Sequence, residues 1–287
     1  MRIARFSLPD SAADAGAVRF GLVEGEPDQH GDSNGYRASG LSAADQSAND
    51  QVGLVIAELE GHPFTPEPRT TGRVWPLADV RLLAPVLPSK VVAVGRNYAD
   101  HAKELGNEVP AVPLTFLKPS TSVIGPNETI AYPSFSQDVH HEAELAIVIG
   151  RLCSQVPRER VKECILGYTC ANDVTARDAQ KAEGQWARAK GFDTSCPIGP
   201  WIETELDPSD LAITCTLNDE LKQAGRTGQM MRGVEELVSF ISEAMTLLPG
   251  DVILTGTPAG VGPMQVGDLV SVSIEGIGTL TNRIVKR

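Results

Sequence analysis

The chain has 287 residues, of which 41% are hydrophobic and 22% charged, a composition typical of a globular protein with a real core. Its formal net charge of −12 would repel a phosphate backbone, so we expect no nucleic-acid partner, although a bound cation can reverse the local sign and admit an anionic substrate. Five cysteines without C-x-x-C spacing argue against a disulfide framework or a structural zinc site and favour a reducing compartment.

The N-terminal part of the chain predicts a small β unit. Short runs rich in Val, Ile and Phe, separated by Gly, Pro and Asp, are typical of strands in hairpins, and they occur at 2–6, 18–24 and 52–58. Residues 28–51, between the second and third of these runs, have little apolar content, so we expect a mobile surface loop. The alternative is that this segment is a tolerated insertion with no role. The prolines of 67–89 predict an extended linker. We therefore divide the chain into a small N-terminal β domain, 1–86, and a catalytic domain, 87–287.

The expected location is the cytoplasm, with no membrane contact. The first residues run into polar ones without the apolar region of a signal peptide. No apolar run approaches the length that crosses a bilayer.

Strand signals outnumber helical ones in the rest of the chain. Apolar, β-rich runs occur at 91–94, 114–117, 145–149, 213–217, 252–255 and 269–274. Helical patterns are expected at 98–105, 158–164 and 234–245. Because the two kinds do not alternate regularly, a doubly wound sheet or a (β/α)₈ barrel is disfavoured, and the predicted class is α+β, mainly β.

An acidic pair precedes the most apolar run. Residues 145–149 are apolar at every position, as in a strand buried on both faces, and Glu142 and Glu144 come directly before this run. Side chains two apart on a strand share a face, so these carboxylates would lie close together where both repulsion and desolvation are costly. A hard divalent cation with oxygen ligands would relieve both costs. The alternative is that the pair faces solvent at a strand edge.

Asp173 is a candidate third carboxylate. It follows the strand-like run 165–169 and would lie where that strand gives way to a turn. An Asp in a turn is also a common cap or Asx-turn residue, and this alternative stays open.

Five motifs occur in an order that resembles the fumarylacetoacetate hydrolase family. They are GRNY at 95–98, HEAELAIVIG at 141–150, NDVTARD at 172–178, KGFD with PIGP at 190–193 and 197–200, and TGTPAGVG at 255–262. The resemblance covers residues 87–287, about 70% of the chain. Within the family it is closest to acylpyruvate hydrolases, oxaloacetate decarboxylases and 2-hydroxyhepta-2,4-diene-1,7-dioate isomerases. It implies a mixed β-sandwich roll behind a small N-terminal β domain, and a homodimer.

The resemblance also implies residue roles. The implied metal ligands, for Mg²⁺ or Mn²⁺, are Glu142, Glu144 and Asp173. The implied substrate-binding residues are Arg96, Lys118, Gly256 and Thr257, and Lys190 matches a lysine close to metal and substrate. His141 stands where the family commonly has Tyr or Phe. As a strand neighbour of Glu142 it would point to the opposite face.

The implied chemistry acts on a small 2-oxo acid. A metal held by three carboxylates keeps positions open for such a ligand and stabilises the enolate that forms when a neighbouring C–C or C–H bond breaks. Hydrolysis also needs a base, and His101 and Glu104, three apart on an expected helix, would share a face. They match a His-x-x-Glu pair on a mobile lid in hydrolytic family members; the alternative is that both are exposed surface residues. Catalytic roles are thus expected for His101, Glu104 and Lys190.

Three functions fit these residues. The first is metal-dependent C–C cleavage, either acylpyruvate or fumarylpyruvate hydrolysis or oxaloacetate decarboxylation. The second is isomerisation of 2-hydroxyhepta-2,4-diene-1,7-dioate without attack by water, and the third is a family member that binds metal or ligand without catalysis. A serine-hydrolase motif is absent, no lysine makes the 255–262 loop a phosphate-binding P-loop, and no histidine pattern points to Cys196 as a nucleophile.

Overall fold

Most of the strands belong to one large mixed sheet. The computed structural model describes residues 1–25, 53–65, 67–104, 106 and 108–287, and the predicted loop at 28–51 lies outside the described residues. The strands of this sheet are β1 Arg2–Ser7, β2 Val18–Glu24, β3 Val55–Leu59, β4 Thr70–Pro76, β5 Arg81–Leu83, β6 Val91–Gly95, β7 Leu114–Lys118, β8 Val123–Ile124, β11 Ala143–Ile149, β12 Ile165–Asn172, β14 Cys196–Glu203 and β17 Val252–Leu254. Within the described residues their order is β4-β3-β2-β1-β14-β12-β11-β17-β6-β7, with β5 beside β1 and β8 beside β14.

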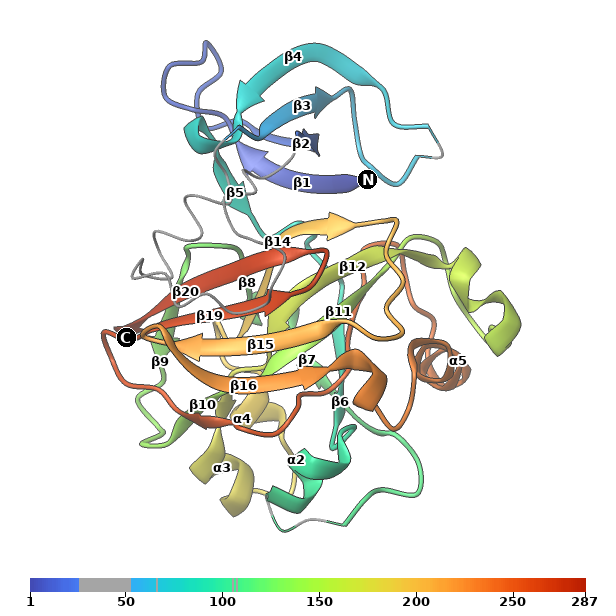
Figure 1. Cartoon of the computed structure of the whole chain (residues 1–287), viewed down its shortest axis with the longest axis vertical. Coiled ribbons are helices and arrows are strands. Elements are labelled where there is room, and N and C mark those ends of the chain that lie inside the picture. The colour runs from blue at the N-terminus through green and yellow to red at the C-terminus, as the bar shows by residue number, and fades with distance from the viewer. Residues whose placement is uncertain (26–52, 66, 105, 107) are drawn as a thin grey trace.

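A second sheet packs against the first. Its strands are β9 Thr129–Tyr132, β15 Ala212–Leu217, β16 Glu220–Arg226, β19 Leu269–Ile274 and β20 Gly278–Lys286, in the order β16-β15-β19-β20-β9. A smaller one joins β10 Val139–His141, β13 Thr175–Ala176 and β18 Gly262–Pro263. Figure 1 shows the five-stranded sheet lying across β11 and β12. The chain is therefore α+β and mainly β, as predicted.

The strand β11 separates two parts of the core. All seven of its residues are buried, which confirms the prediction of a strand covered on both faces. Leu145 and Ile147 pack into the cluster shared with the five-stranded sheet, whereas Ala146 and Val148 pack into a second cluster with residues of β6, β14 and β17. Since side chains alternate along a strand, Glu144 faces the same side as Ala146.

The N-terminal strands share the large sheet with the rest of the chain. Strand β1 pairs with β14 through Arg2 opposite Glu203 and Ile3 opposite Ile202. Figure 1 shows β1 to β4 as a layer at one end of the molecule. The division of the chain at residue 86 into two domains stays a prediction.

The predicted linker at 67–89 was wrong. It contains β4, the 3₁₀-helix η1 Leu77–Asp79 and β5. Strand β4 lies at the end of the sheet order and pairs only with β3 among the described strands. An edge strand tolerates proline, so Pro76 closes β4 without breaking a ladder on its free side. The β-branched and aromatic residues before it had carried the strand signal.

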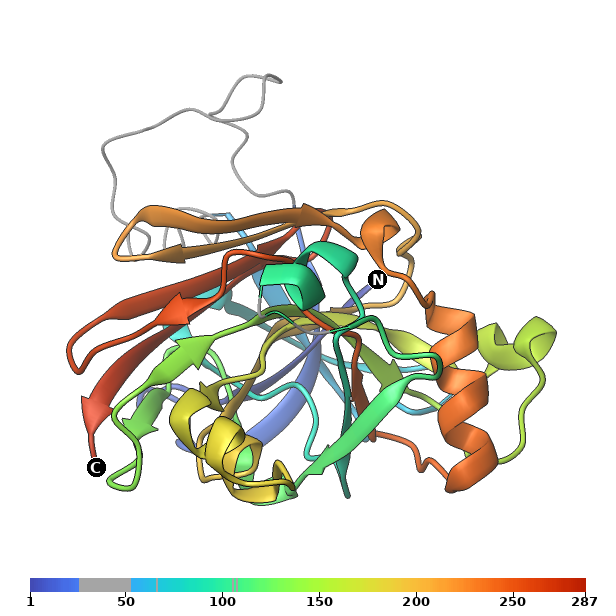
Figure 2. The ribbon, with the colours of Figure 1, turned by 90° about the horizontal axis from the view of Figure 1, so that it is seen from below.

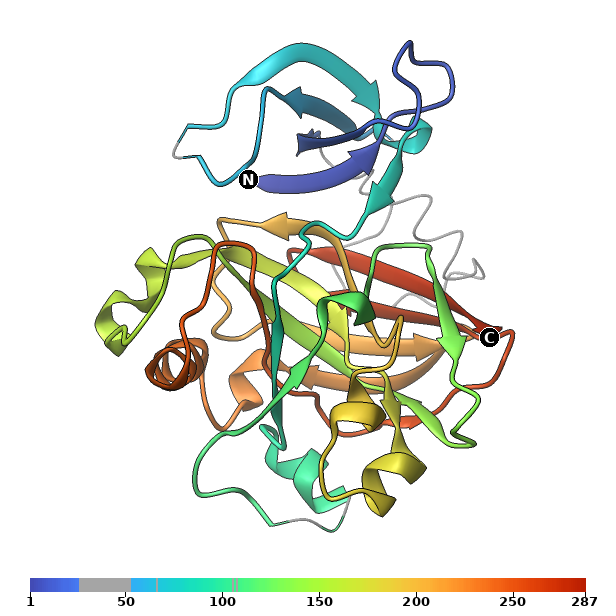
Figure 3. The ribbon, with the colours of Figure 1, turned by 180° about the vertical axis from the view of Figure 1, so that it is seen from behind.

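Within the described residues the helices are short and few. They are α2 Ala99–Glu104, α3 Arg177–Ala182, α4 Ala187–Lys190 and α5 Val234–Ala244, with 3₁₀-helices η2 Ser120–Ser122, η3 Arg158–Glu163 and η4 Thr227–Gln229. The helix expected at 158–164 is thus a 3₁₀-helix. Figures 1 and 3 show α2, α3 and α4 together at the end away from β1–β4, and Figure 2 shows them from that end, in front of the strands. None of the described helices is long and apolar enough to span a membrane.

Candidate active site

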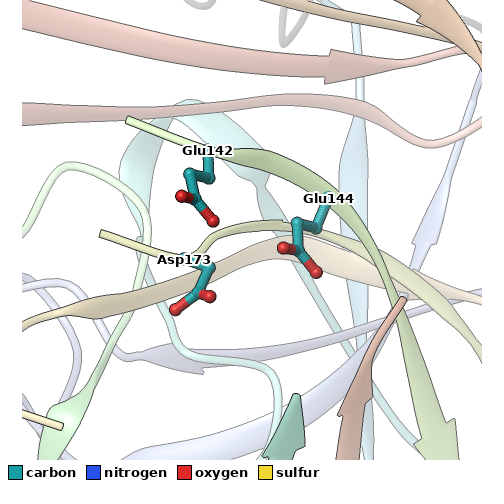
Figure 4. Close-up of side chains that lie close together, drawn as sticks. All are labelled: Glu142, Glu144 and Asp173. Atoms are coloured by element: carbon teal, nitrogen blue, oxygen red, sulfur yellow. The ribbon is translucent and has the colours of Figure 1, made fainter. Parts of the chain in front are cut away.

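Three carboxylates converge where β11 begins and β12 ends. These strands pair antiparallel, with Glu144 opposite Ala171, and the backbone N–H of Asp173 donates to the carbonyl of Glu142 at 2.9 Å. The pairing brings the residue after β12 beside the start of β11. Figure 4 shows Glu142 and Glu144 on the same side of their strand, with Asp173 next to them. One oxygen of each carboxylate lies within 4.8 Å of the other two, and all three residues are at most 3% exposed.

Buried cations pair with two of these carboxylates. Lys190, the last residue of α4, donates from Nζ to Glu142 Oε2 at 2.7 Å and to Asp173 Oδ2 at 2.6 Å. Lys118 donates to Asp173 Oδ1 at 2.6 Å and to the Lys190 carbonyl, and Arg177 donates to Glu142 Oε1. Although burial alone would raise it, Lys190 and Arg177 hold the pKa of Glu142 well below its ordinary value. Burial alone would lower the pKa of Lys190, but the negative charges of Asp173 and Glu142 raise it above its ordinary value.

Glu144 is the carboxylate that no cation of the described residues contacts. Among those residues its hydrogen-bond donor is the backbone N–H of Gly256, at 2.7 Å. Burial and then repulsion from Asp173 and Glu142 raise the pKa of Glu144 well above its ordinary value. A divalent cation among these three groups would relieve both effects, and buried carboxylate oxygens are the ligands that Mg²⁺ and Mn²⁺ prefer. The residues present therefore fit such an ion.

His101 and Glu104 lie beside the carboxylates, on α2. The side chain of His101 is 6% exposed and that of Glu104 is 34% exposed, with Nδ1 and Oε2 3.4 Å apart. Glu104 also accepts the backbone N–H of Gly260 at 3.0 Å, which ties α2 to the 255–262 loop. Burial lowers the pKa of His101, so its imidazole is neutral at physiological pH. The buried histidine is not the exposed surface residue that the alternative interpretation required.

A cavity of about 220 Å³ lies against these groups. Its lining includes seven residues to which the sequence analysis gave a role: Arg96, His101, Glu142, Glu144, Asp173, Lys190 and Thr257. The other three candidate residues, Glu104, Lys118 and Gly256, are not among the described residues that line the cavity. The Lys118 ammonium donates a hydrogen bond to Asp173, and the Gly256 N–H donates one to Glu144. In this structure both groups therefore position an acidic side chain. Their substrate-binding roles stay predictions.

Four lining residues with polar or aromatic side chains had no predicted role: Arg177, Gln180, Lys181 and Trp186. The first three lie on α3, which begins four residues after Asp173. Arg177 was within a quoted motif, and its place one turn beyond a candidate metal-ligating Asp is the signal that could have singled it out. Trp186 lies 5.9 Å from the Arg96 guanidinium, measured from Cζ to the ring centroid. Nothing in its sequence neighbourhood marks it.

Comparison with known proteins gives two family matches. Residues 90–285 match the model described as fumarylacetoacetate (FAA) hydrolase, C-terminal, and residues 1–85 match the model described as Rv2993c-like, N-terminal. The chain is 50% identical over 290 residues to Protein Rv2993c of Mycobacterium tuberculosis, covering 100% of this chain and 99% of that protein.

Two further relatives carry descriptive names. The mitochondrial oxaloacetate tautomerase FAHD2B of Bos taurus is 43% identical over 225 residues, which are 74% of this chain and 72% of that protein. The crystal structure of 2-hydroxyhepta-2,4-diene-1,7-dioate isomerase from Mycobacterium marinum is 49% identical with a TM-score of 0.84, covering 100% of this chain and 99% of that chain.

Proposed function

We propose that this chain, which belongs to the fumarylacetoacetate hydrolase family, moves protons on a small 2-oxo acid with the help of a divalent cation. The family membership confirms the resemblance predicted from five motifs. The observation that carries the proposal is the convergence of Glu142, Glu144 and Asp173, all buried, with Glu144 contacted by no cation of the described residues. When bound there, a divalent cation would act as a Lewis acid toward the oxygens of a 2-oxo acid.

The chain itself supplies a proton acceptor and positive charge. His101 is buried, lines the cavity and is neutral, as a general base must be. Arg177 and Lys190 line the same cavity and hold positive charge where an enolate would carry its negative charge. Together they favour removal of a proton from the carbon next to the oxo group.

The charge balance favours a dicarboxylate. The buried cations of Lys118, Arg177 and Lys190 balance the three carboxylates, so a divalent cation would leave the site with an excess of positive charge. Arg96 and Lys181 line the cavity in addition, and neither makes an ion pair with a described residue. A 2-oxo dicarboxylate of the oxaloacetate class neutralises this excess, whereas a monocarboxylate does so only in part.

Tautomerisation or isomerisation is the reaction we favour. Two relatives named as an oxaloacetate tautomerase and a 2-hydroxyhepta-2,4-diene-1,7-dioate isomerase support it, since both names describe proton movement without attack by water. The second candidate is C–C cleavage, by hydrolysis or decarboxylation. It is favoured by the contact between His101 and Glu104, because a carboxylate that orients an imidazole is the arrangement that activates water.

One substrate separates the candidates. With oxaloacetate, the ultraviolet absorbance of the enol follows tautomerisation and a coupled lactate dehydrogenase assay follows release of pyruvate, each with Mg²⁺, Mn²⁺ or EDTA. We expect enol conversion above the metal-only rate, its loss in EDTA and in Glu142→Ala, and its recovery when metal is restored to the wild-type enzyme. Release of pyruvate that depends on Glu104 would favour cleavage. Full turnover by enzyme stripped of metal would contradict the proposal.

The assembly is also a proposal. Family resemblance implies a homodimer, which light scattering of the purified chain tests directly. A monomer at working concentrations would remove this part without affecting the chemistry.

A further inference from the structure

Gln223 is a fully buried polar residue that connects β16 to the candidate active site. It faces β11 from the side opposite the carboxylates, where it meets His141 and the backbone of Ala143. Its Oε1 accepts the Ala143 N–H at 3.0 Å and lies 3.0 Å from His141 Nδ1. Its Nε2 lies 2.8 Å from Thr257 Oγ1 and 2.8 Å from the carbonyl oxygen of Pro258.

Backbone groups fix the orientation of this amide. The N–H of Ala143 can only donate, so the atom facing it must be the amide oxygen of Gln223. The carbonyl of Pro258 can only accept, so the atom facing it must be the amide nitrogen. It follows that His141 carries a proton on Nδ1, which it donates to Gln223. It also follows that Thr257 Oγ1 accepts a hydrogen bond from Gln223.

The proton of the Thr257 hydroxyl then has one good direction. Among the described residues its acceptor is the carbonyl oxygen of Pro258, 3.5 Å away, which is beyond the usual range of about 2.5–3.0 Å for an O–H···O hydrogen bond. That oxygen already accepts from Gln223. Thr257 lines the cavity, so its hydroxyl can donate to an oxygen of a bound molecule there.

We propose that Gln223 is a positioning residue that keeps Thr257 a hydrogen-bond donor toward a carboxylate oxygen of the substrate. The inference rests on the proposed function, because it assumes that a 2-oxo acid occupies the cavity. Substrate groups that can only donate hydrogen bonds are therefore disfavoured beside Thr257, because they cannot accept the proton of its hydroxyl. His141 holds the far end of the amide and keeps Gln223 from turning over.

The decisive variant is Gln223→Glu, which keeps the shape and replaces the donor by an acceptor. The Thr257 hydroxyl then donates to the introduced carboxylate in place of the substrate. A hydrogen bond to a charged group corresponds to roughly a 10- to 100-fold change in binding. We therefore expect KM for oxaloacetate, and the Kd of oxalate measured by calorimetry with Mg²⁺, to rise by about that factor with kcat little changed.

Thr257→Val, made alone and with Gln223→Glu, tests whether Gln223 acts through Thr257. Made alone, the valine should raise the Kd of oxalate by a similar factor, and combined with Gln223→Glu it should add nothing. Ser271→Ala, which removes a buried hydroxyl pair with Thr281 in the same sheet, is the matched control and should leave KM and Kd unchanged. Gln223→Met, of similar size and unable to make these bonds, replaces Gln223→Glu if the buried charge prevents folding. It frees the Pro258 carbonyl, which can then compete with the substrate for the Thr257 proton.

The outcomes separate the two proposals. If the wild-type protein binds oxalate but Thr257→Val costs its full factor in either Gln223 variant, the positioning role is overturned and the proposed function stands. A loss of kcat and thermal stability without a change in Kd would equally overturn it, because a purely structural residue behaves that way. If wild-type protein neither binds oxalate nor converts any 2-oxo acid, the proposed function fails, and the inference with it.

Discussion

Removing the charge of Glu144 should stabilise the metal-free protein. Two unit charges 4.8 Å apart repel by about 3.5 kcal/mol at an effective dielectric constant of about 20, and Glu144 faces two such charges, on Glu142 and Asp173. Uptake of a proton limits the cost to about 1.4 kcal/mol for each pH unit above the ordinary pKa, or about 3.4 kcal/mol at pH 7. Since the nearby cations offset part of the repulsion, we expect Glu144→Gln to gain about 1–3 kcal/mol. The amide oxygen can still accept the Gly256 N–H.

The gain has a defined pH dependence. The folded-state pKa of Glu144 is raised, so the wild-type carboxyl costs nothing below its unfolded pKa of about 4.5 and becomes costly as the pH rises toward the folded value. The advantage of the glutamine variant should therefore grow with pH above about 4.5 and then level off. Thermal unfolding in EDTA measures it, at about 2–4 °C for each kcal/mol.

Metal should reduce this advantage. At 100 times its Kd, a bound cation stabilises the wild-type protein by about 2.7 kcal/mol, and a site that binds it tenfold more weakly loses about 1.3 kcal/mol of that stabilisation. Asp173→Asn is the matched control, because it removes the carboxylate charge that Lys118 and Lys190 share and should destabilise the metal-free protein. Destabilisation by Glu144→Gln in EDTA at every pH, or a response to metal equal to that of the wild type, would refute this prediction.

Three other changes follow from the same structure. His101→Gln should lower kcat by about 10²- to 10⁴-fold. Because burial lowers the pKa of His101, the acid limb of the pH profile of kcat/KM in the wild type should lie below about pH 6.5, with activity lost as the pH falls through it. Ile147→Ala should cost about 2–5 kcal/mol in denaturant unfolding, whereas Leu117→Ala, at a side chain that is half exposed, should cost less than about 1 kcal/mol. Asp251→Ala should cost about 3–5 kcal/mol of unfolding free energy. Although burial alone would raise it, hydrogen bonds from Leu248 and Lys90 hold the pKa of Asp251 below its ordinary value. The wild type should therefore lose this stability as the pH falls below about 4. A variant as stable as the wild type at pH 7 would contradict that assignment.

The local geometry of the acidic strand was predictable from the sequence. The two-residue spacing of Glu142 and Glu144 requires a shared face, and the apolar run after them predicts burial, and both predictions are confirmed. The approach of Asp173 was not predictable from spacing. It depends on the pairing of β12 with β11, which places Asn172 opposite Ala143. The sequence itself marked Asp173 only as a candidate, and the family resemblance implied its place beside the two glutamates.

The network around the site lay beyond sequence reasoning for the same reason. Lys118 ends a strand at the edge of the large sheet, yet its ammonium reaches Asp173 across 55 positions of sequence. Gln223, in a strand of the other sheet, meets His141 across 82 positions. A single polar residue in a strand gives no periodic signal, and its partners depend on how two sheets pack. The strand at 70–76 was missed because the surrounding prolines obscured the β-branched and aromatic residues between them.

By pairing with β14, the first residues of the chain cover one side of that strand. Ile3 is fully buried in the same apolar cluster as Ala146, and Arg2 and Ile3 complete the outer side of β14. A chain cut before residue 87 would bare that side of β14, and bare sheet edges recruit other chains. Expression of residues 87–287 alone would then favour aggregation through β14, which pairs with β12, the strand that ends next to Asp173.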